Sequence, residues 1–236
     1  MADARSQRRL IRLVEANRRV RDPDHEPRNR LPVLTALQRW QAERLRRSFA
    51  DFLASPRQRP AAEFFLSDLY GDFDVSARDR DVERVLPVMR RVLPERLLEA
   101  ATDAIELAVL SHALDLRVAE ALARKGSRKI TEADYAEAYR AAGLHRLRRH
   151  QVGLIVRLGL TLDRAVSKPM IGHLLRLSRG PARAAGLADL QSFLERGFDA
   201  FRALGGASAF VNEIARREML VSSRLFEGHP RPFEPS

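Results

Sequence analysis

Residues 94–124, PERLLEAATDAIELAVLSHALDLRVAEALAR, carry the pattern that decides the fold. Pro94 suits the first turn of a helix, and apolar residues then return every three or four positions. One stripe contains Leu98, Ile105, Val109, Leu116 and Ala119. A stripe of this kind is typical of a helix face that packs on other helices. We therefore expect a long buried helix that ends before Lys125-Gly126.

Helical spacing continues on both sides of this segment. Further helices are predicted over residues 6–20, 32–55, 60–70, 145–167, 187–204 and 207–225, from Ser76, from Pro169, and from Thr131 to near Gly143. Thr131 and Asp134 have the spacing of a capping box. No stretch of four or more residues alternates apolar and polar side chains as a strand would. The sequence predicts an all-α protein, a compact bundle of about eight to ten helices without a β-sheet.

Composition divides the chain into three parts. Residues 1–31 are expected to form an arginine-rich helix and a polar linker, and residues 32–225 a single helical domain. Residues 226–236 are expected to be an irregular, loosely held tail. Whether the first helix packs on the domain or projects from it stays open at this point.

The chain is basic, and its charge is unevenly distributed. Its 42 basic and 31 acidic residues give a formal net charge of +11. Residues 1–60 contain 15 basic and 7 acidic residues, a local excess of +8. Such a segment suits a polyanionic partner, for example nucleic acid. All but three of the basic residues are arginines, which a GC-rich coding sequence explains as well as phosphate binding does.

Several classes of protein are excluded by what the sequence lacks. It has no cysteine, and therefore no disulfide framework, thiolate metal site or cysteine nucleophile. The most apolar run, residues 152–162, has 11 residues and includes Arg157, whereas about 20 are needed to span a bilayer. The beginning of the chain lacks the pattern of a secretory signal. We expect no membrane span and a cytoplasmic location.

Motifs for common enzymatic chemistry are also missing. There is no glycine-rich phosphate loop, no G-x-S-x-G and no H-E-x-x-H. None of the six histidines follows a glutamate by three residues, as a di-iron helical bundle would require. The sequence therefore predicts no catalytic residue, no metal site and no cofactor.

AAEFFLSDLYGDFDVSARDRD, at residues 61–81, resembles an uncharacterised bacterial family with an FFL-x-DLYG signature followed by Ser-x-Arg-Asp. Further matches to that family lie in ITEADYAEAYR (130–140), at Lys168-Pro169 and in RGPARAAGLADLQSFLERGFDAFR (179–202). The resemblance implies a bacterial helical protein containing a domain of unknown function. It implies no activity, ligand or functional residue.

Two structural interpretations of this signature remain open. Its apolar residues can pack around a short helix that Gly71 ends. Alternatively, Asp68, Tyr70 and Asp79 can line a polar pocket together with His112 of the long helix. His112 lies on the apolar stripe, where a histidine is either a hydrogen-bonded core residue or a ligand for haem or a metal.

One acidic row on the long helix also has two interpretations. Glu99, Asp103 and Glu106 share one helix face, where they are either solvated and paired with arginines of a neighbouring helix or a metal site.

The preferred functional hypothesis is a non-enzymatic binding protein that contacts an unidentified protein partner through its basic N-terminal region. The first alternative is sequence-independent nucleic-acid binding through Arg8, Arg9, Arg12, Arg18, Arg19, Arg39, Arg46 and Arg47. The second is a haem- or small-ligand-binding protein or an enzyme that uses the pocket at Asp68, Tyr70, Asp79 and His112. The oligomeric state is left open.

Overall fold

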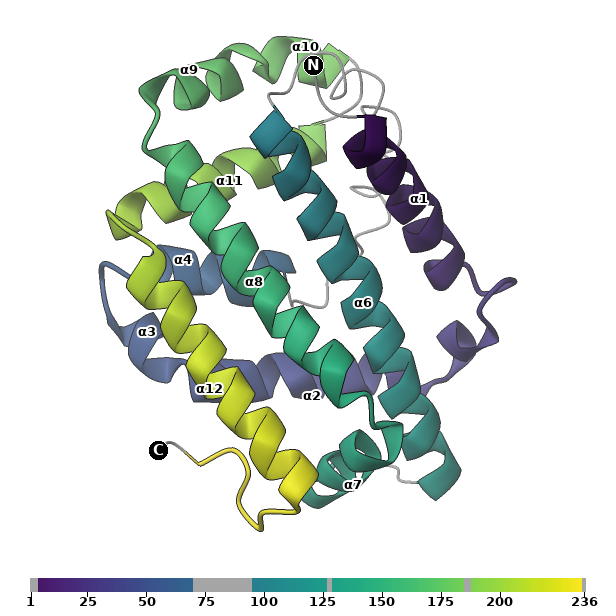
Figure 1. The fold of residues 1–236 in the computed structure, drawn as a ribbon. Coiled ribbons are helices and arrows are strands. Elements are labelled where there is room, and N and C mark those ends of the chain that lie inside the picture. Colours follow the sequence, from purple (N-terminus) through teal and green to yellow (C-terminus); the bar gives the residue numbers. More distant parts are fainter. Residues whose placement is uncertain (1–3, 70–94, 127–128, 185–187, 235–236) are drawn as a thin grey trace.

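A computed structural model describes residues 4–69, 95–126, 129–184 and 188–234 of the chain. Every regular element within these residues is a helix, which confirms the all-α prediction (Figure 1). In chain order they are α1 (Ala4–Arg21), the 3₁₀ helix η1 (Pro27–Arg30), α2 (Val33–Ser48), α3 (Ala50–Ala54), α4 (Arg59–Glu63), the π-helix η2 (Phe64–Leu69), α6 (Glu95–Lys125), α7 (Glu132–Ala142), α8 (His145–Val166), α9 (Pro169–Leu177), α10 (Arg179–Ala184), α11 (Ala188–Leu204) and α12 (Ser208–Glu227).

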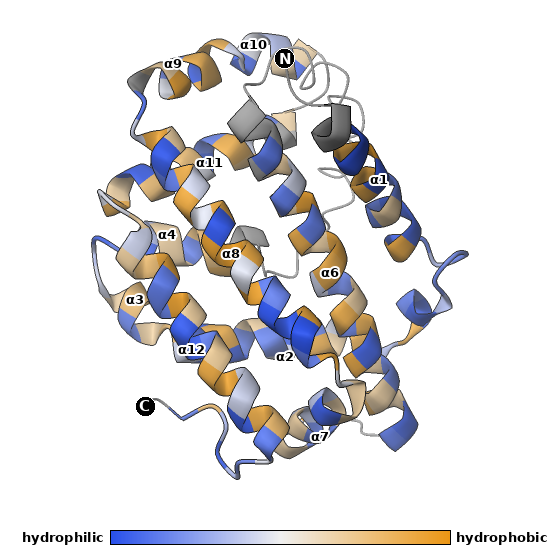
Figure 2. Ribbon diagram, in the orientation of Figure 1, coloured by the Kyte–Doolittle hydropathy of each residue, from blue (hydrophilic) through white to orange (hydrophobic). Residues whose placement is uncertain are grey.

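The long helix expected from the opening pattern is α6, and it runs through the middle of the bundle. It contacts α1, α2, α7 and α8, while α8 also packs on α11 and α12. Polar and apolar positions alternate around the helices, as expected for amphipathic helices (Figure 2). None of the described helices is both long and apolar enough to cross a membrane.

Buried apolar side chains form two clusters. One surrounds Phe49, Leu154 and Ile214, and the other surrounds Leu37 and Leu116. Phe64, Phe65 and Leu66 of the FFLSDLYG segment are buried in the first cluster, which agrees with a packing role for these three residues. Gly71 and the helix expected from Ser76 lie outside the described residues.

Local signals account for some helix ends and miss others. The capping box is present: Thr131 Oγ1 accepts the Asp134 N–H at 3.1 Å, and Asp134 Oδ2 accepts the Thr131 N–H at 3.1 Å. The single helix expected over residues 32–55 is wrong, because the backbone of Phe49 (φ −119°, ψ 26°) separates α2 from α3. The buried ring of Phe49 joins the first core cluster, and this packing favours the break.

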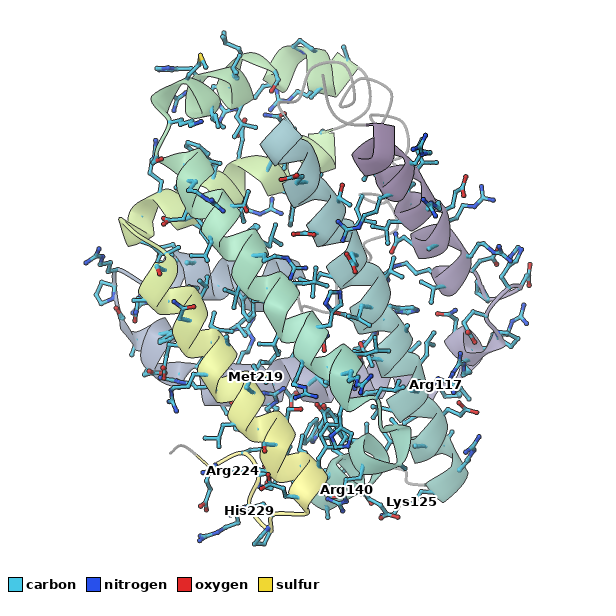
Figure 3. The ribbon with its side chains drawn as sticks, viewed as in Figure 1. Arg117, Lys125, Arg140, Met219, Arg224 and His229 are labelled. Atoms are coloured by element: carbon cyan, nitrogen blue, oxygen red, sulfur yellow. The ribbon has the colours of Figure 1, made fainter. Side chains whose placement is uncertain are left out.

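The C-terminal tail packs on the bundle. Phe233 lies with its ring centroid 5.7 Å from that of Trp40 and 5.9 Å from that of Tyr135. Arg224 Nη1 donates to the carbonyl oxygen of Glu234 at 2.6 Å, near the end of the molecule where Arg140 also lies (Figure 3). The expectation of a loosely held tail is therefore wrong as far as Glu234, because its aromatic ring completes a buried cluster.

Candidate partner-binding site

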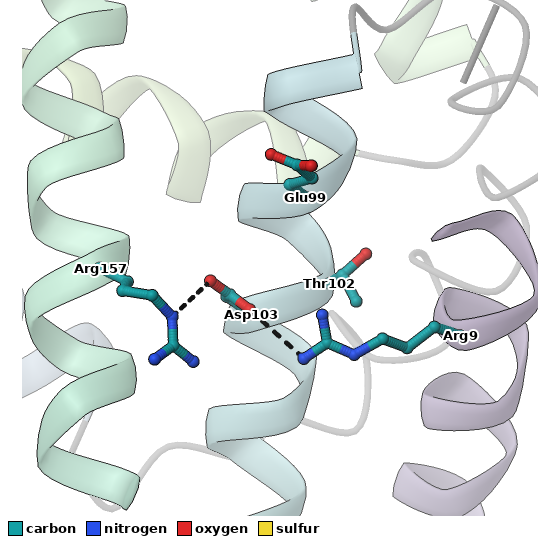
Figure 4. A pocket seen from close by; sticks show the side chains of 5 residues that line it. All are labelled: Arg9, Glu99, Thr102, Asp103 and Arg157. Carbon is teal, nitrogen blue, oxygen red and sulfur yellow. Dashed lines mark hydrogen bonds and ion pairs between the residues drawn. The ribbon is translucent and has the colours of Figure 1, made fainter. Parts of the chain in front are cut away.

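The first helix is fastened to α6 by apolar and charged contacts. Leu10 of α1 is fully buried, and α1 packs along α6. Arg9 forms ion pairs with Glu106 and with Asp103, whose Oδ1 lies 3.6 Å from Arg9 Nη2. Arg157 of α8 reaches the other oxygen of Asp103 at 3.2 Å from the opposite side (Figure 4). Asp103 therefore joins α1, α6 and α8, and α1 is held in a defined position.

The acidic row on α6 is paired with cations in this arrangement. Besides Arg9, Glu106 forms a hydrogen bond with His150 Nε2 at 2.8 Å. Burial opposes ionisation of Glu106, but His150 and Arg9 outweigh it and lower the pKa of that carboxyl. Glu99 is exposed and lines the same pocket as Asp103. Within the described residues, no group of three or more histidine and carboxylate side chains could hold a metal ion.

The other arginines predicted on α1 are displayed to solvent. Arg8, Arg12, Arg18 and Arg19 have exposed side chains. Arg12 Nε makes a long hydrogen bond of 3.4 Å to the carbonyl oxygen of Arg8. Among the residues that the structure describes, none of the four has a carboxylate within ion-pair distance. Their charge is thus available to a partner, unlike that of Arg9.

A shallow groove of about 530 Å³ runs beside this face of α1. It is lined by Arg12, Glu15, Ala16, Arg19, Val20, His25, Glu26 and Val109. Arg12 and Arg19 are two helical turns apart on α1, and Val109 belongs to α6. The groove therefore combines separated cations, two carboxylates and apolar side chains.

The three candidate arginines of α2 lie elsewhere on the molecule. Arg39, Arg46 and Arg47 are exposed, but α2 crosses behind α6, whereas α1 lies along one side of it (Figure 1). Arg47 Nη2 is 3.5 Å from Glu132 Oε1 of α7. The structure thus places the eight arginines of the nucleic-acid hypothesis on two helices, with Arg9 in ion pairs.

His112 is buried, and its ring has a protein partner. Its Nε2 lies 2.7 Å from the side-chain oxygen of Asn29 in η1. Because Asn29 Nδ2 donates to the carbonyl oxygens of Val20 and Glu26, the Asn29 oxygen must accept, and His112 donates as a neutral ring. Burial, together with the charge of Arg21, lowers the pKa of His112 to about 4. These contacts favour the interpretation of His112 as a hydrogen-bonded core residue.

The structure does not describe the side chains of the other residues predicted to line a pocket with His112. The backbone of Asp68 belongs to η2, but its side chain is not among those described. Tyr70 and Asp79 lie outside the described residues. A pocket joining these residues to His112 therefore stays a prediction.

The geometry can now be set beside the comparison with known proteins. A family model described as a domain of unknown function, DUF8198, matches residues 20–232. The chain belongs to the DUF8198 family. This confirms the expected membership of a family of unknown function, and it adds no activity or ligand to the DUF8198 chain. No curated protein and no solved structure matches it.

This DUF8198 chain contains two buried arginines that the sequence reasoning missed. Arg44 of α2 forms a bidentate ion pair with Glu218 of α12, with distances of 2.5 and 3.0 Å. Burial alone would lower the pKa of Arg44, but the Glu218 carboxylate outweighs it and raises that pKa above its usual value. The pair ties α2 to α12 across the core.

Arg148 of α8 has a less complete set of partners in the DUF8198 chain. Its guanidinium lies 4.5 Å from the ring centroid of Tyr139, and Nη1 donates to Gln151 at 3.4 Å. Among the described residues its Nε and Nη2 have no hydrogen-bond partner. Asp115 receives a hydrogen bond from Gln41 at 3.2 Å, and burial raises the pKa of that carboxyl to about 6 despite the charge of Arg148.

Helical spacing contained a signal for both arginines. Arg44 follows the buried Leu37 by seven residues, and Arg148 precedes the buried Ile155 by seven, so each lies on an apolar stripe. The basic neighbours Arg146 and Arg149 mask this signal, because a cluster of cations is typical of a solvated or anion-binding helix face.

Proposed function

We propose that the protein is a non-enzymatic binding protein that holds an acidic segment of a protein partner in the groove beside α1. The observation that carries the proposal is the groove lining, in which Arg12 and Arg19 occur together with the apolar side chains of Val20 and Val109. Cations combined with apolar contacts fit a segment that carries both carboxylates and apolar residues.

The same groove is less suited to a nucleic acid. A phosphate backbone has uniform charge and needs little more than cations. Here Val20 and Val109 share the groove with the cations, and these apolar side chains would gain little from contact with a phosphate backbone. The mixed lining therefore favours a protein segment over the nucleic-acid alternative.

The position of α1 supports this role. Arg9 and Leu10 fix the helix on α6, so the backbone that carries the exposed arginines is already in position before a partner arrives. A preordered surface loses less conformational entropy on binding. A cytoplasmic location is part of the proposal.

The test is fluorescence anisotropy with two labelled probes, an acidic peptide of alternating Glu and Leu and a DNA strand of equal charge. We expect the peptide to bind, and the Arg12→Glu/Arg19→Glu variant to bind it about tenfold more weakly. Arg146→Glu/Arg149→Glu is the matched control, because it makes the same change in net charge at exposed positions on α8. Preferential binding of DNA with a steep salt dependence, or an equal loss in the control, would contradict the proposal.

A further inference from the structure

The short helix α9 displays large apolar side chains to solvent. Met170, Leu174 and Leu177 are 68%, 56% and 75% exposed. Spaced at i, i+4 and i+7, they form one ridge along the helix. Gly172 lies on the opposite side, where an added Cβ would be 2.9 Å from the ring of Phe198 in α11. The ridge therefore points away from the bundle.

The sequence around this ridge is free of negative charge. Residues 164–188 contain Arg164, Lys168, Arg176, Arg179 and Arg183 and no aspartate or glutamate. Arg179 is used internally, because it makes a bidentate contact of 2.7 Å with Glu195. Lys168, Arg176 and Arg183 are exposed, and the described part of the chain gives them no ion pair. Exposed cations thus lie on the same segment of the chain as the apolar ridge.

The place of α9 and α10 in the fold makes this surface accessible. They lie together at the end of the bundle opposite α7, and they pack on α8 and α11 (Figure 1). Figure 2 shows apolar positions along α9 at this end of the molecule. Both elements can therefore meet a flat surface without moving the rest of the bundle.

We propose that the α9–α10 surface docks on an anionic lipid membrane. A helix that lies in a membrane interface places apolar side chains among the acyl chains and cations among the headgroups. The ridge supplies the first and Lys168, Arg176 and Arg183 supply the second. Charge complementarity selects anionic lipid, because 25 residues without a carboxylate attract phosphate headgroups and none repels them. This contact is separate from the α1 groove and from any bilayer-spanning helix.

The test is cosedimentation of the full chain with vesicles of phosphatidylcholine alone or containing phosphatidylglycerol. We expect binding only to the anionic vesicles, and about a fivefold loss for each cation removed. Arg176→Gln/Arg183→Gln is compared with Arg146→Gln/Arg149→Gln, which has the same net charge. The ridge variant Met170→Gln/Leu174→Gln/Leu177→Gln is expected to lose binding by tenfold or more, roughly, whereas Leu147→Gln, an exposed leucine on α8, should not.

Three results would overturn the proposal. The full chain stays in the supernatant with anionic vesicles, or the ridge variant sediments as the unaltered chain does. Alternatively, the unaltered chain is a dimer by light scattering and the ridge variant a monomer, which would assign the ridge to self-association. Thermal melts followed by circular dichroism show whether each variant is folded. Retained vesicle binding by Arg12→Glu/Arg19→Glu is expected, because those residues lie outside this surface.

Discussion

At the scale of single residues, Arg44 is a charged side chain buried in the protein interior, where a charge without a partner is strongly destabilising. It is 7% exposed, and its only carboxylate partner among the described residues is Glu218. Removing water from a guanidinium costs free energy that a good ion pair offsets only in part. The pair therefore acts less as a net source of stability than as a requirement that α2 and α12 meet in one register.

Glu218→Gln is expected to lower the free energy of unfolding by about 3 kcal/mol or more, because the buried charge of Arg44 loses its counter-charge. Urea denaturation measures the change. The double variant Arg44→Met/Glu218→Leu should regain most of the loss, since it removes both charges. Equal stability of the single variant and the unaltered chain would show that the pair is not desolvated.

His112 predicts a dependence of stability on pH. Its native pKa of about 4 lies below the unfolded value of about 6.5, so the unfolded chain binds the proton first. The stability from His112 is complete above about pH 6.5 and is lost as the pH falls towards 4, by about 3 kcal/mol. Urea denaturation measures the stability of the unaltered chain and of His112→Gln at both ends of this pH range. The difference in stability between the two proteins should change by that amount from one end to the other. A constant difference would count against the neutral buried ring.

Sequence reasoning reached some of these residues and missed others for a physical reason. The apolar stripe of α6 predicted a buried His112, because helical spacing alone fixes which face is covered. It could not supply Asn29, the hydrogen-bond partner, which is 83 residues away along the chain. Arg148 was missed because its charge and its neighbours Arg146 and Arg149 suggested solvent, whereas the ring of Tyr139 from another helix covers it.

At the scale of elements, local chemistry predicted most helices but only some of their ends. Thr131 and Asp134 act within one turn, so their capping box was visible in the sequence. The break at Phe49 depends on packing against other elements, and no glycine or proline marks it. Contacts between helices also depend on the positions of small residues. Gly159 lets α8 approach α12 closely, because it lies directly against Val211.

Gly159→Ala is expected to lower the free energy of unfolding by about 1–3 kcal/mol, because the new methyl group would overlap Val211. Gly153→Ala in the same helix is the control, since its nearest neighbour is the Arg157 side chain at 3.8 Å. There the gain in helix propensity should stabilise the protein by up to about 1 kcal/mol. Thermal or urea unfolding of both variants gives the comparison, and equal effects would argue against close α8–α12 packing.

At the scale of the whole molecule, periodicity showed that each helix has an apolar face but not which helix covers it. The sequence left open whether the N-terminal helix projects or packs, and the structure places it against α6. The ion pair between Arg9 and Asp103 could not be predicted from sequence spacing, because 94 residues separate the two. The predicted boundary at residue 31 stays a prediction.

Deleting residues 1–22 tests how strongly α1 belongs to the bundle. The deletion uncovers the surface that buries Leu10 and Val14, so we expect the melting temperature to fall by about 10 °C. Circular dichroism of the shortened and full chains measures the shift. An unchanged melting temperature would mean that α1 is an independent arm.

Trp40 gives the fold an optical consequence. It is the one tryptophan of the chain, and its ring stacks on Tyr135 with a centroid distance of 4.4 Å while Phe233 covers its edge. The wavelength of its fluorescence maximum therefore reports whether Phe233 is packed against α2 and α7. Trp40 lies far from α9, so binding at the α9 end of the bundle should leave its emission unchanged. Intrinsic tryptophan fluorescence therefore distinguishes changes at one end of the molecule from changes at the other without an added label.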